Sequence, residues 1–137
     1  MEDAAARATV FDLIIVDDEP AILEGLERTY DWDRFGFRVV GTAKSGEQAL
    51  SLVYELNPDV VMTDIQMRRM GGLELIERCQ EYDPALEFVI VSAHDDFIYA
   101  QQACALGVFS YLLKPIDDEQ IRSVMIDLHA LCGRSRD

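Results

Sequence analysis

A chain of 137 residues, half of them apolar, is long enough to bury one hydrophobic core and too short for two ordinary domains. Its net charge of −14, from 26 acidic and 12 basic side chains, argues against direct binding to nucleic acid, which depends on lysine and arginine at the phosphates. No apolar run approaches the ~18 residues of a membrane span, and residues 1–9 lack the apolar stretch of a signal peptide. We therefore expect one soluble, cytoplasmic domain without a membrane partner, preceded by residues 1–9 as a disordered tail.

The predicted elements alternate between strands and helices. Residues 10–16 are almost continuously apolar, as in a strand covered on both faces, and Glu19-Pro20 then begins a helix, since proline suits the first helical turn. Residues 31–37 are less regular, and we expect Trp32, with its aromatic neighbours, to close this helix against the next strand. In chain order, the sequence predicts strands at 10–16, 37–42, 59–63, 86–91 and 108–113, and helices at 20–30, 46–56, 73–80, 95–106 and 118–132.

Helical spacing predicts which side chains face the core. Ser45 is expected to cap its helix and Gly107 to end another in a left-handed conformation. The three cysteines, Cys79, Cys104 and Cys132, lie far apart in apolar helical patterns, which favours reduced, buried thiols. The other predicted inward side chains are Ala49, Val53, Leu56, Leu73, Ile76, Ile121, Val124, Met125 and Leu128.

Five strand-helix units in a chain of this length predict an α/β fold with a doubly wound parallel sheet, because right-handed crossovers leave few other topologies. Four of the apolar strands stop at polar residues: Asp17-Asp18, Asp64, Ser92 and Lys114. The carboxyl ends of parallel strands share one edge of the sheet, so these side chains should converge on one point.

Their chemistry is complementary. Three carboxylates close together repel unless a hard divalent cation such as Mg²⁺ lies between them. A hydroxyl and an ammonium beside that cation are donors suited to the oxygens of a phosphoryl group. Lys114 is informative because the chain has only two lysines. The sequence therefore predicts phosphoryl chemistry on one of the aspartates.

In their order and spacing, these residues resemble the receiver domain of bacterial two-component response regulators, over residues 10–130. The resemblance implies a flavodoxin-like sheet of order 2-1-3-4-5 with five helices. It implies a receiver domain at residues 10–132, followed by 133–137 as a tail or the start of a linker. It also implies a signalling phosphoacceptor rather than an enzyme, whose Asp64 takes a phosphoryl group from a sensor histidine kinase.

The resemblance assigns further roles. Ser92 and Lys114 are implied to contact the phosphoryl group on Asp64. Tyr111 matches an aromatic residue whose orientation follows activation, and Pro115 matches a position that usually follows a cis peptide bond. The implied Mg²⁺ ligands are Asp17, Asp18, Asp64 and the backbone carbonyl of Gln66.

The implied output surface comprises the helix at 95–106, the strand at 108–113 and the last helix. Its exposed aromatic and apolar side chains, among Phe97, Ile98 and Tyr99, would serve homodimerisation or docking to an effector domain. His94 follows Ser92 closely and is either a bystander or a general base toward the phosphoryl group. His129, late in the last helix, is expected to lie on the surface.

The loop after Asp64 departs from the family pattern. It reads Met67-Arg68-Arg69-Met70-Gly71-Gly72, with Arg68 in place of the usual proline and Gly71 in place of the usual acid. This loop should be more mobile and more basic than average. It removes none of the proposed ligands.

The segments 94–100 and 107–116 are similar to receivers that precede AraC-type helix-turn-helix domains. We therefore expect a fragment of a transcription regulator whose DNA-binding domain is not in this chain, with a stand-alone regulator as the alternative. Two other functions stay open: a receiver-like interaction module that works without phosphorylation, and a haloacid-dehalogenase-type phosphatase. The latter is disfavoured because its nucleophile would follow the first strand in an Asp-x-Asp pattern, where this chain has Asp17-Asp18-Glu19.

Overall fold

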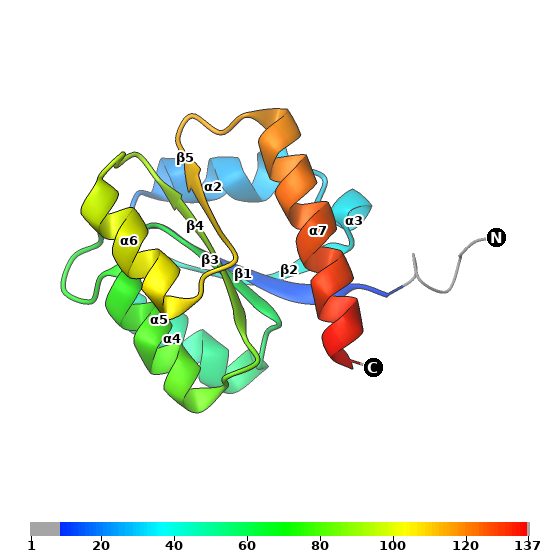
Figure 1. Cartoon of the computed structure of the whole chain (residues 1–137), viewed down its shortest axis with the longest axis horizontal. Coiled ribbons are helices and arrows are strands. Elements are labelled where there is room, and N and C mark those ends of the chain that lie inside the picture. Colours follow the sequence, from blue (N-terminus) through cyan, green and yellow to red (C-terminus); the bar gives the residue numbers. More distant parts are fainter. Residues whose placement is uncertain (1–8, 137) are drawn as a thin grey trace.

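The structure, a computed structural model, describes residues 9–136, which form a central sheet of five strands covered by six helices (Figure 1). The strands are β1 (Phe11–Val16), β2 (Phe37–Ala43), β3 (Val60–Thr63), β4 (Glu87–Ser92) and β5 (Ser110–Leu113). The helices are α2 (Pro20–Thr29), α3 (Trp32–Phe35), α4 (Gly46–Leu56), α5 (Gly72–Tyr82), α6 (Phe97–Leu106) and α7 (Asp118–Arg136).

All paired strands are parallel, and their order is β2-β1-β3-β4-β5. The predicted doubly wound, flavodoxin-like fold is thereby confirmed. β2 and β5 are the edge strands, and the chain changes direction across the sheet between β1 and β3. At such a crossover the loops that follow neighbouring strands separate and leave room for a ligand.

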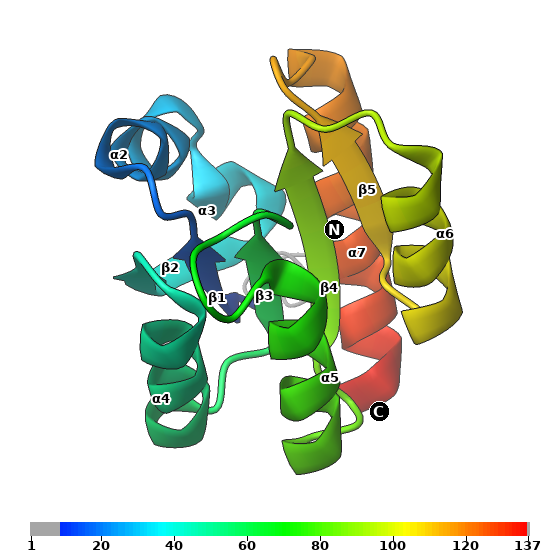
Figure 2. The same cartoon turned by 90° about the vertical axis from the view of Figure 1, so that its left-hand side faces the viewer.

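The core consists of two clusters, one on each face of the sheet. Leu13 and Ile15 of β1 face the cluster under α2, α3 and α7, whereas Ile14 and Val16 face the cluster under α4, α5 and α6. Figure 2 shows the two helical layers on opposite sides of the sheet. Because both faces are covered, the central strands are apolar at nearly every position, as the sequence indicated.

The pairing of β1 with β2 contains one irregularity. Leu13 pairs with Val39 and Ile14 with Gly41, so Val40 has no opposite residue in β1. Val39 packs on the α2 side of the sheet and Val40 on the α4 side, as successive residues of a strand do. Because of the irregularity, Ala43 also faces the α4 side, although it follows Val40 by three positions.

The predicted count of five helices was wrong, because α3 forms a sixth within the stretch expected to be less regular. Trp32 is buried, its ring contacts Tyr30 and Phe35 edge-on, and its Nε1 donates to the backbone oxygen of Leu26. This anchoring holds a single helical turn, which Gly36 ends at φ +89°. The predicted closing role of Trp32 is confirmed.

His129 of α7 is half-buried, and the expectation of a plain surface residue was wrong. Its ring packs edge-on against Phe11 and Phe37, and its Nε2 lies 2.9 Å from the backbone oxygen of Thr9. A Cβ on Gly36 would lie 2.2 Å from the ring. The absent side chain at Gly36 is what lets the histidine approach the sheet.

Three side chains predicted to face the core are less buried than expected. Leu56 is exposed because it lies over Gly41 of the edge strand β2, which offers no side chain to cover it. Leu73 is only half-buried, since α5 turns Leu75, Ile76 and Cys79 inward instead. Val124 is half-buried at the margin of the inward stripe of α7.

Cys104 was predicted to be buried and is exposed. Apolar residues surround α6 on several faces, so the sequence pattern does not identify its inward side. Cys79 and Cys132 are free and buried, as predicted. The caps expected at Ser45, which accepts from the backbone N–H of Gln48, and at Gly107, with φ +80°, are confirmed.

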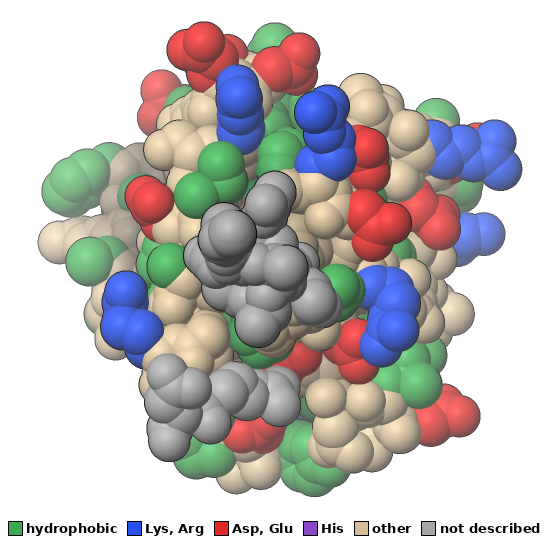
Figure 3. Space-filling model, turned by 90° about the vertical axis from the view of Figure 1, so that its right-hand side faces the viewer, with side chains coloured by type: hydrophobic (Ala, Val, Ile, Leu, Met, Phe, Trp, Pro, Cys, Tyr) green, Lys and Arg blue, Asp and Glu red, His purple; other side chains and the backbone are tan. Residues whose placement is uncertain are grey.

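The predicted tail at residues 1–9 lies, apart from Thr9, outside the described residues. Helix α7 continues to Arg136 and so crosses the predicted boundary between residues 132 and 133. Among the helices that the structure describes, none is long and apolar enough to cross a membrane. Acidic and basic side chains are interspersed over the face shown in Figure 3.

Candidate functional site

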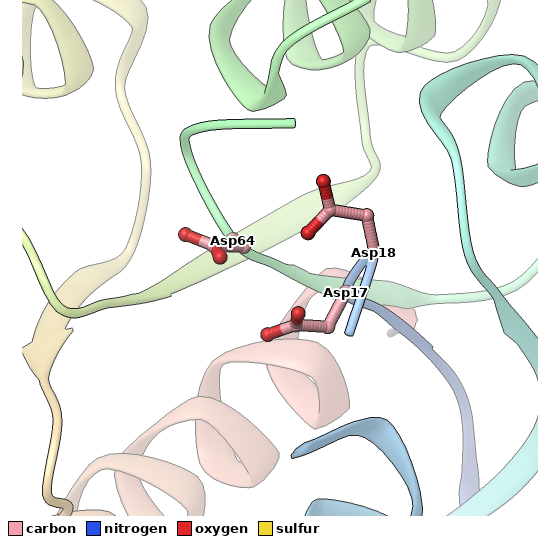
Figure 4. Close-up of side chains that lie close together, drawn as sticks. All are labelled: Asp17, Asp18 and Asp64. Carbon is pink, nitrogen blue, oxygen red and sulfur yellow. The ribbon is translucent and has the colours of Figure 1, made fainter. Parts of the chain in front are cut away.

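Three aspartates meet at the carboxyl end of the sheet. Asp17 and Asp18 follow β1, and Asp64 follows β3 (Figure 4). Each of the three carboxylates offers an oxygen within 4.8 Å of the others. The backbone fixes this arrangement, because the N–H of Asp64 donates to Val16 O and the N–H of Asp17 donates to Ala43 O, both at 3.1 Å. The strand-end prediction correctly brought these residues together.

Lys114 lies among these acids. Its Nζ donates to Asp17 Oδ2 at 2.8 Å and lies 3.5 Å from Asp64 Oδ2. The backbone N–H of Lys114 donates to Ser92 O at 2.8 Å, which aligns the residue after β5 with the end of β4. The Lys114-Pro115 peptide bond is cis, as predicted.

The charges in this cluster shift one another's protonation. Burial raises the pKa of Asp64; the charge of Lys114 opposes this, and the charge of Asp17 adds to it. Burial alone would lower the pKa of Lys114, but its hydrogen bond to Asp17 and the charge of Asp64 outweigh burial and raise the pKa above its ordinary value. Two unit charges about 5 Å apart at an effective dielectric near 20 repel by roughly 3 kcal/mol. The single positive charge of Lys114 therefore does not balance the negative charges of the three carboxylates.

The donor set suits a hard divalent cation. Carboxylate oxygens are the ligands that Mg²⁺ prefers, and an additional positive charge would relieve the repulsion that raises the pKa of Asp64. Asp17 already has partners on both oxygens, since Oδ1 accepts from the backbone N–H of Glu19 and Oδ2 from Lys114. Asp64 Oδ1 accepts from the backbone N–H of Ile65, and its Oδ2 has only the longer contact with Lys114 at 3.5 Å. Asp18 is therefore the most available of the three ligands.

Ser92 is fully buried at the end of β4, and its Oγ accepts from the backbone N–H of His94 at 3.1 Å. The hydroxyl of Tyr111 donates to the backbone oxygen of His94 at 2.8 Å. Tyr111, which the resemblance implies to be a switch residue, therefore holds the loop after Ser92 through this hydrogen bond. The His94 side chain is exposed at the protein surface.

The loop from Asp64 to α5 is tightly packed at both ends. The carboxylate of Asp64 accepts from the backbone N–H of Ile65 at 2.6 Å, and the Thr63 hydroxyl donates to the backbone oxygen of Asp64 at 2.8 Å. A Cβ on Gly72 would lie 2.2 Å from the Asp64 oxygen. Gly72 thus allows α5 to begin directly against the phosphoacceptor candidate.

The unusual residues Arg68 and Arg69 are exposed, and Arg69 adopts φ +64°. With Lys44 they line a hollow beside Asp18. Acidic side chains, those of Glu19 and Glu47, also line this hollow. Within the described residues, none of the three cationic side chains forms an ion pair.

Two residues near the site were not assigned a site role from the sequence. The role of Gly72 can be recognised only once the close approach of α5 to Asp64 is known. Tyr99 receives a hydrogen bond from Gln66 Nε2, whereas the sequence predicts for it only a place on the output surface. Its spacing from Gln66 carries no local signal, because the contact joins the loop after β3 to the first turn of α6.

Comparison with known proteins gives a consistent match. Residues 13–126 match the family described as the response regulator receiver domain. The chain is 34% identical over 121 residues to an uncharacterized transcriptional regulatory protein, YesN, of Bacillus subtilis, covering 88% of this chain and 33% of that protein. It is 37% identical over 116 residues to the transcriptional regulatory protein HptR of Staphylococcus aureus, covering 85% and 45%.

Among solved structures, the receiver domain of AraT, a response regulator from Geobacillus stearothermophilus, superimposes with a TM-score of 0.86 at 35% identity. That match covers 94% of this chain and all of the other. The chain spans between a third and a half of the length of the curated relatives named above.

Proposed function

The chain belongs to the family of response regulator receiver domains, which are signalling domains rather than metabolic enzymes, and on this premise we propose that Asp64 is its phosphoacceptor. The observation that carries this proposal is the position of the Asp64 carboxylate, grouped with two further carboxylates and 3.5 Å from a lysine ammonium. The proposed donor is the phosphohistidine of a sensor histidine kinase.

In the proposed reaction a carboxylate oxygen of Asp64 attacks phosphorus. The P–N bond to the kinase histidine breaks, its electron pair goes to the imidazole nitrogen, and that nitrogen takes up a proton. Lys114 is already at the site and would share the charge of one phosphoryl oxygen, and Ser92 would donate its hydroxyl to another. Both would have to exchange their present contacts for the phosphoryl group.

We propose that Mg²⁺ is held by Asp18, Asp64, Asp17 and the backbone carbonyl of Gln66. When bound, it would neutralise charge on the phosphoryl oxygens during transfer. The clustered carboxylates and the raised pKa of Asp64 support this proposal.

The proposed output is control of transcription through an AraC-type DNA-binding domain, with homodimerisation on activation. Support comes from the names of the relatives, which are transcriptional regulators, and from the exposed Phe97 and Ile98 at the start of α6. A shift of ~5.5 kcal/mol in favour of one state takes a 1:99 mixture to 99:1, so a few contacts of the new dianion would suffice to redistribute the conformations.

Intact mass spectrometry after incubation with acetyl phosphate and Mg²⁺ tests the proposal. We expect a gain of one phosphoryl group, about 80 Da, that requires Mg²⁺ and is absent from Asp64→Asn. An adduct that persists in Asp64→Asn would place the acceptor elsewhere.

Absence of any adduct in the native sequence would contradict the proposal and favour a phosphorylation-independent interaction module. Beryllofluoride provides the second measurement, since a mimic of the phosphoryl group should alter the oligomeric state if the switch operates. Steady multiple turnover of a phosphate ester would instead indicate a phosphatase.

A further inference from the structure

Tyr99 connects the two loops that flank Asp64. The hydroxyl of Tyr99 accepts a hydrogen bond from Gln66 Nε2, and Gln66 follows the phosphoacceptor candidate by two positions. The rings of Tyr99 and His94 meet edge to face, with centroids 6.2 Å apart and planes at 82°. His94 follows Ser92 by two positions. One tyrosine therefore contacts a side chain from each loop.

The loop after Ser92 is fixed from a second direction. The backbone oxygen of His94 accepts from the hydroxyl of Tyr111, while its N–H donates to Ser92 Oγ. His94 is thus held at its backbone and at its ring. The contacts Gln66–Tyr99–His94, which we call the Tyr99 bridge, form a continuous link between the ends of β3 and β4.

Helix α6, which carries Tyr99, has few other inward contacts. Of its ten residues, all of which the structure describes, only Ala103 is fully buried. Phe97 and Ile98 are 75% and 61% exposed. Tyr99 is half-buried and packs on the core cluster beneath α6, so it is the main inward contact of the first helical turn.

We propose that Tyr99 is a positioning residue that holds the Tyr99 bridge across one side of the phosphoacceptor site and limits the access of water to Asp64. This inference rests on the proposed function and adds to it the residue that sets the lifetime of the aspartyl phosphate. Side chains that close a site slow hydrolysis by excluding water.

The reaction affected is hydrolysis. A water oxygen attacks phosphorus, the bond between phosphorus and the Asp64 oxygen breaks, and the carboxylate and inorganic phosphate are released with one proton passing to solvent. Tyr99→Phe keeps the ring contact with His94 but loses the acceptor for Gln66. The Gln66 side chain is exposed and would then turn freely into solvent, which opens that side of the site.

The chain provides a matched control. The hydroxyl of Tyr82 donates to Asn57 Oδ1 at 2.7 Å, so this pair also joins a tyrosine hydroxyl to a side-chain amide. This pair joins the ends of α4 and α5, and neither residue is adjacent to a site residue. Tyr82→Phe therefore removes an equivalent hydroxyl without touching the Tyr99 bridge.

The experiment phosphorylates the full chain with acetyl phosphate and Mg²⁺, removes the donor by desalting, and follows the decay of the phosphorylated mass. We expect Tyr99→Phe to decay about three- to tenfold faster than the native sequence, with an unchanged midpoint of urea unfolding. Tyr82→Phe should decay at the native rate. Equal or slower decay of Tyr99→Phe would overturn the inference.

Gln66→Leu provides the second variant, in case Tyr99→Phe is unstable, and should also decay faster. The double variant should decay no faster than the faster single variant, because both substitutions break the same link. If the increases in decay rate of the two single variants multiply in the double variant, the two residues do not act through one link and the inference is contradicted. If the native sequence forms no adduct, the proposed function fails and this inference fails with it, whereas an adduct with native decay in every variant overturns only the inference.

Discussion

Lys114 forms its shorter ion pair with Asp17, at 2.8 Å, and its longer contact with Asp64, at 3.5 Å. The Asp17 side chain is 1% exposed, so this lysine is the cation that compensates a buried carboxylate. Asp64 lies farther from the Lys114 ammonium and is compensated less by its charge. Burial raises the pKa of Asp64. Lys114 therefore stabilises the fold through its ion pair with Asp17, and it remains close enough to Asp64 to contact a group bound there.

Replacement of Lys114 by methionine should cost about 3 kcal/mol of unfolding free energy without divalent cations, because it leaves a buried carboxylate unpaired. Urea denaturation in EDTA measures this loss. Saturating Mg²⁺ should restore part of it. Lys44→Met, at the other, exposed lysine, should change stability by less than about 0.5 kcal/mol. Equal losses of unfolding free energy in the two variants would contradict a stabilising ion pair between Lys114 and Asp17.

Asp64→Asn should stabilise the metal-free protein by about 1 kcal/mol at neutral pH. The pKa of Asp64 in the folded state is raised above its ordinary 3.8, so the ionised carboxylate carries a cost at neutral pH. That cost, and hence the advantage of asparagine, should shrink as the pH falls through the folded pKa and vanish below about 3.8.

Urea denaturation in EDTA at several pH values tests this dependence. Asp127→Asn, at an exposed site on α7, serves as the control and should be neutral. A loss of stability in Asp64→Asn at neutral pH would mean that the contact with Lys114 outweighs burial.

Gly36→Ala and Gly107→Ala should differ in cost. Both glycines have a left-handed backbone, with φ +89° and +80°, so alanine should cost each roughly 1 kcal/mol. At Gly36 the new Cβ would also meet the His129 ring at 2.2 Å, whereas at Gly107 nothing lies within 4 Å. We expect Gly36→Ala to lose about 2 kcal/mol more.

Thermal or urea unfolding of both variants gives the difference. His129→Ala introduced into Gly36→Ala should recover much of the excess, because it removes the clashing ring. If the two alanine variants are equally stable, His129 does not confine that turn.

Gly72→Ala should disturb the site itself, since its Cβ would lie 2.2 Å from the backbone oxygen of Asp64. We expect a loss of about 2 kcal/mol or more and slower phosphorylation by acetyl phosphate. Gly133→Ala is the control, because nothing lies within 4 Å of its Cβ and a helical glycine gains up to about 1 kcal/mol on this change. Native phosphorylation of Gly72→Ala would show that the loop relaxes easily.

The three cysteines should react differently with iodoacetamide. Burial raises the pKa of the Cys79 thiol to about 12 and that of Cys132 to about 11, while Cys104 is exposed. Since the thiolate is the nucleophile, mass spectrometry of the native protein at pH ~8 should detect one carbamidomethyl group, on Cys104. Three should appear in urea. Rapid native labelling of Cys79 would contradict its burial.

The fold and the acid cluster were predictable because each depends on a rule that acts along a single strand. A run such as residues 10–16 reports burial on both faces, and the residue after a parallel strand always lies at one edge of the sheet. Asp64 and Lys114 could therefore be brought together across 50 residues of sequence without knowledge of packing.

What could not be predicted depends on contacts between elements. Cys104 lies on a helix with apolar residues on several faces, so only the packing of α6 decides which side is inward. His129 is half-buried because Gly36, in a distant turn, has no side chain. The hydrogen bond from Gln66 to Tyr99 joins the loop after β3 to the first turn of α6, and nothing local in either segment indicates it.

The unpaired Val40 in β2 bears on how chains of this kind can vary in length. Because Leu13 pairs with Val39 and Ile14 with Gly41, the register beyond Val40 is the one that a strand lacking this residue would have. Deletion of Val40 would leave Ala43 opposite Val16 and Asp17 in place. This edge strand can thus lose one residue without moving the acid cluster.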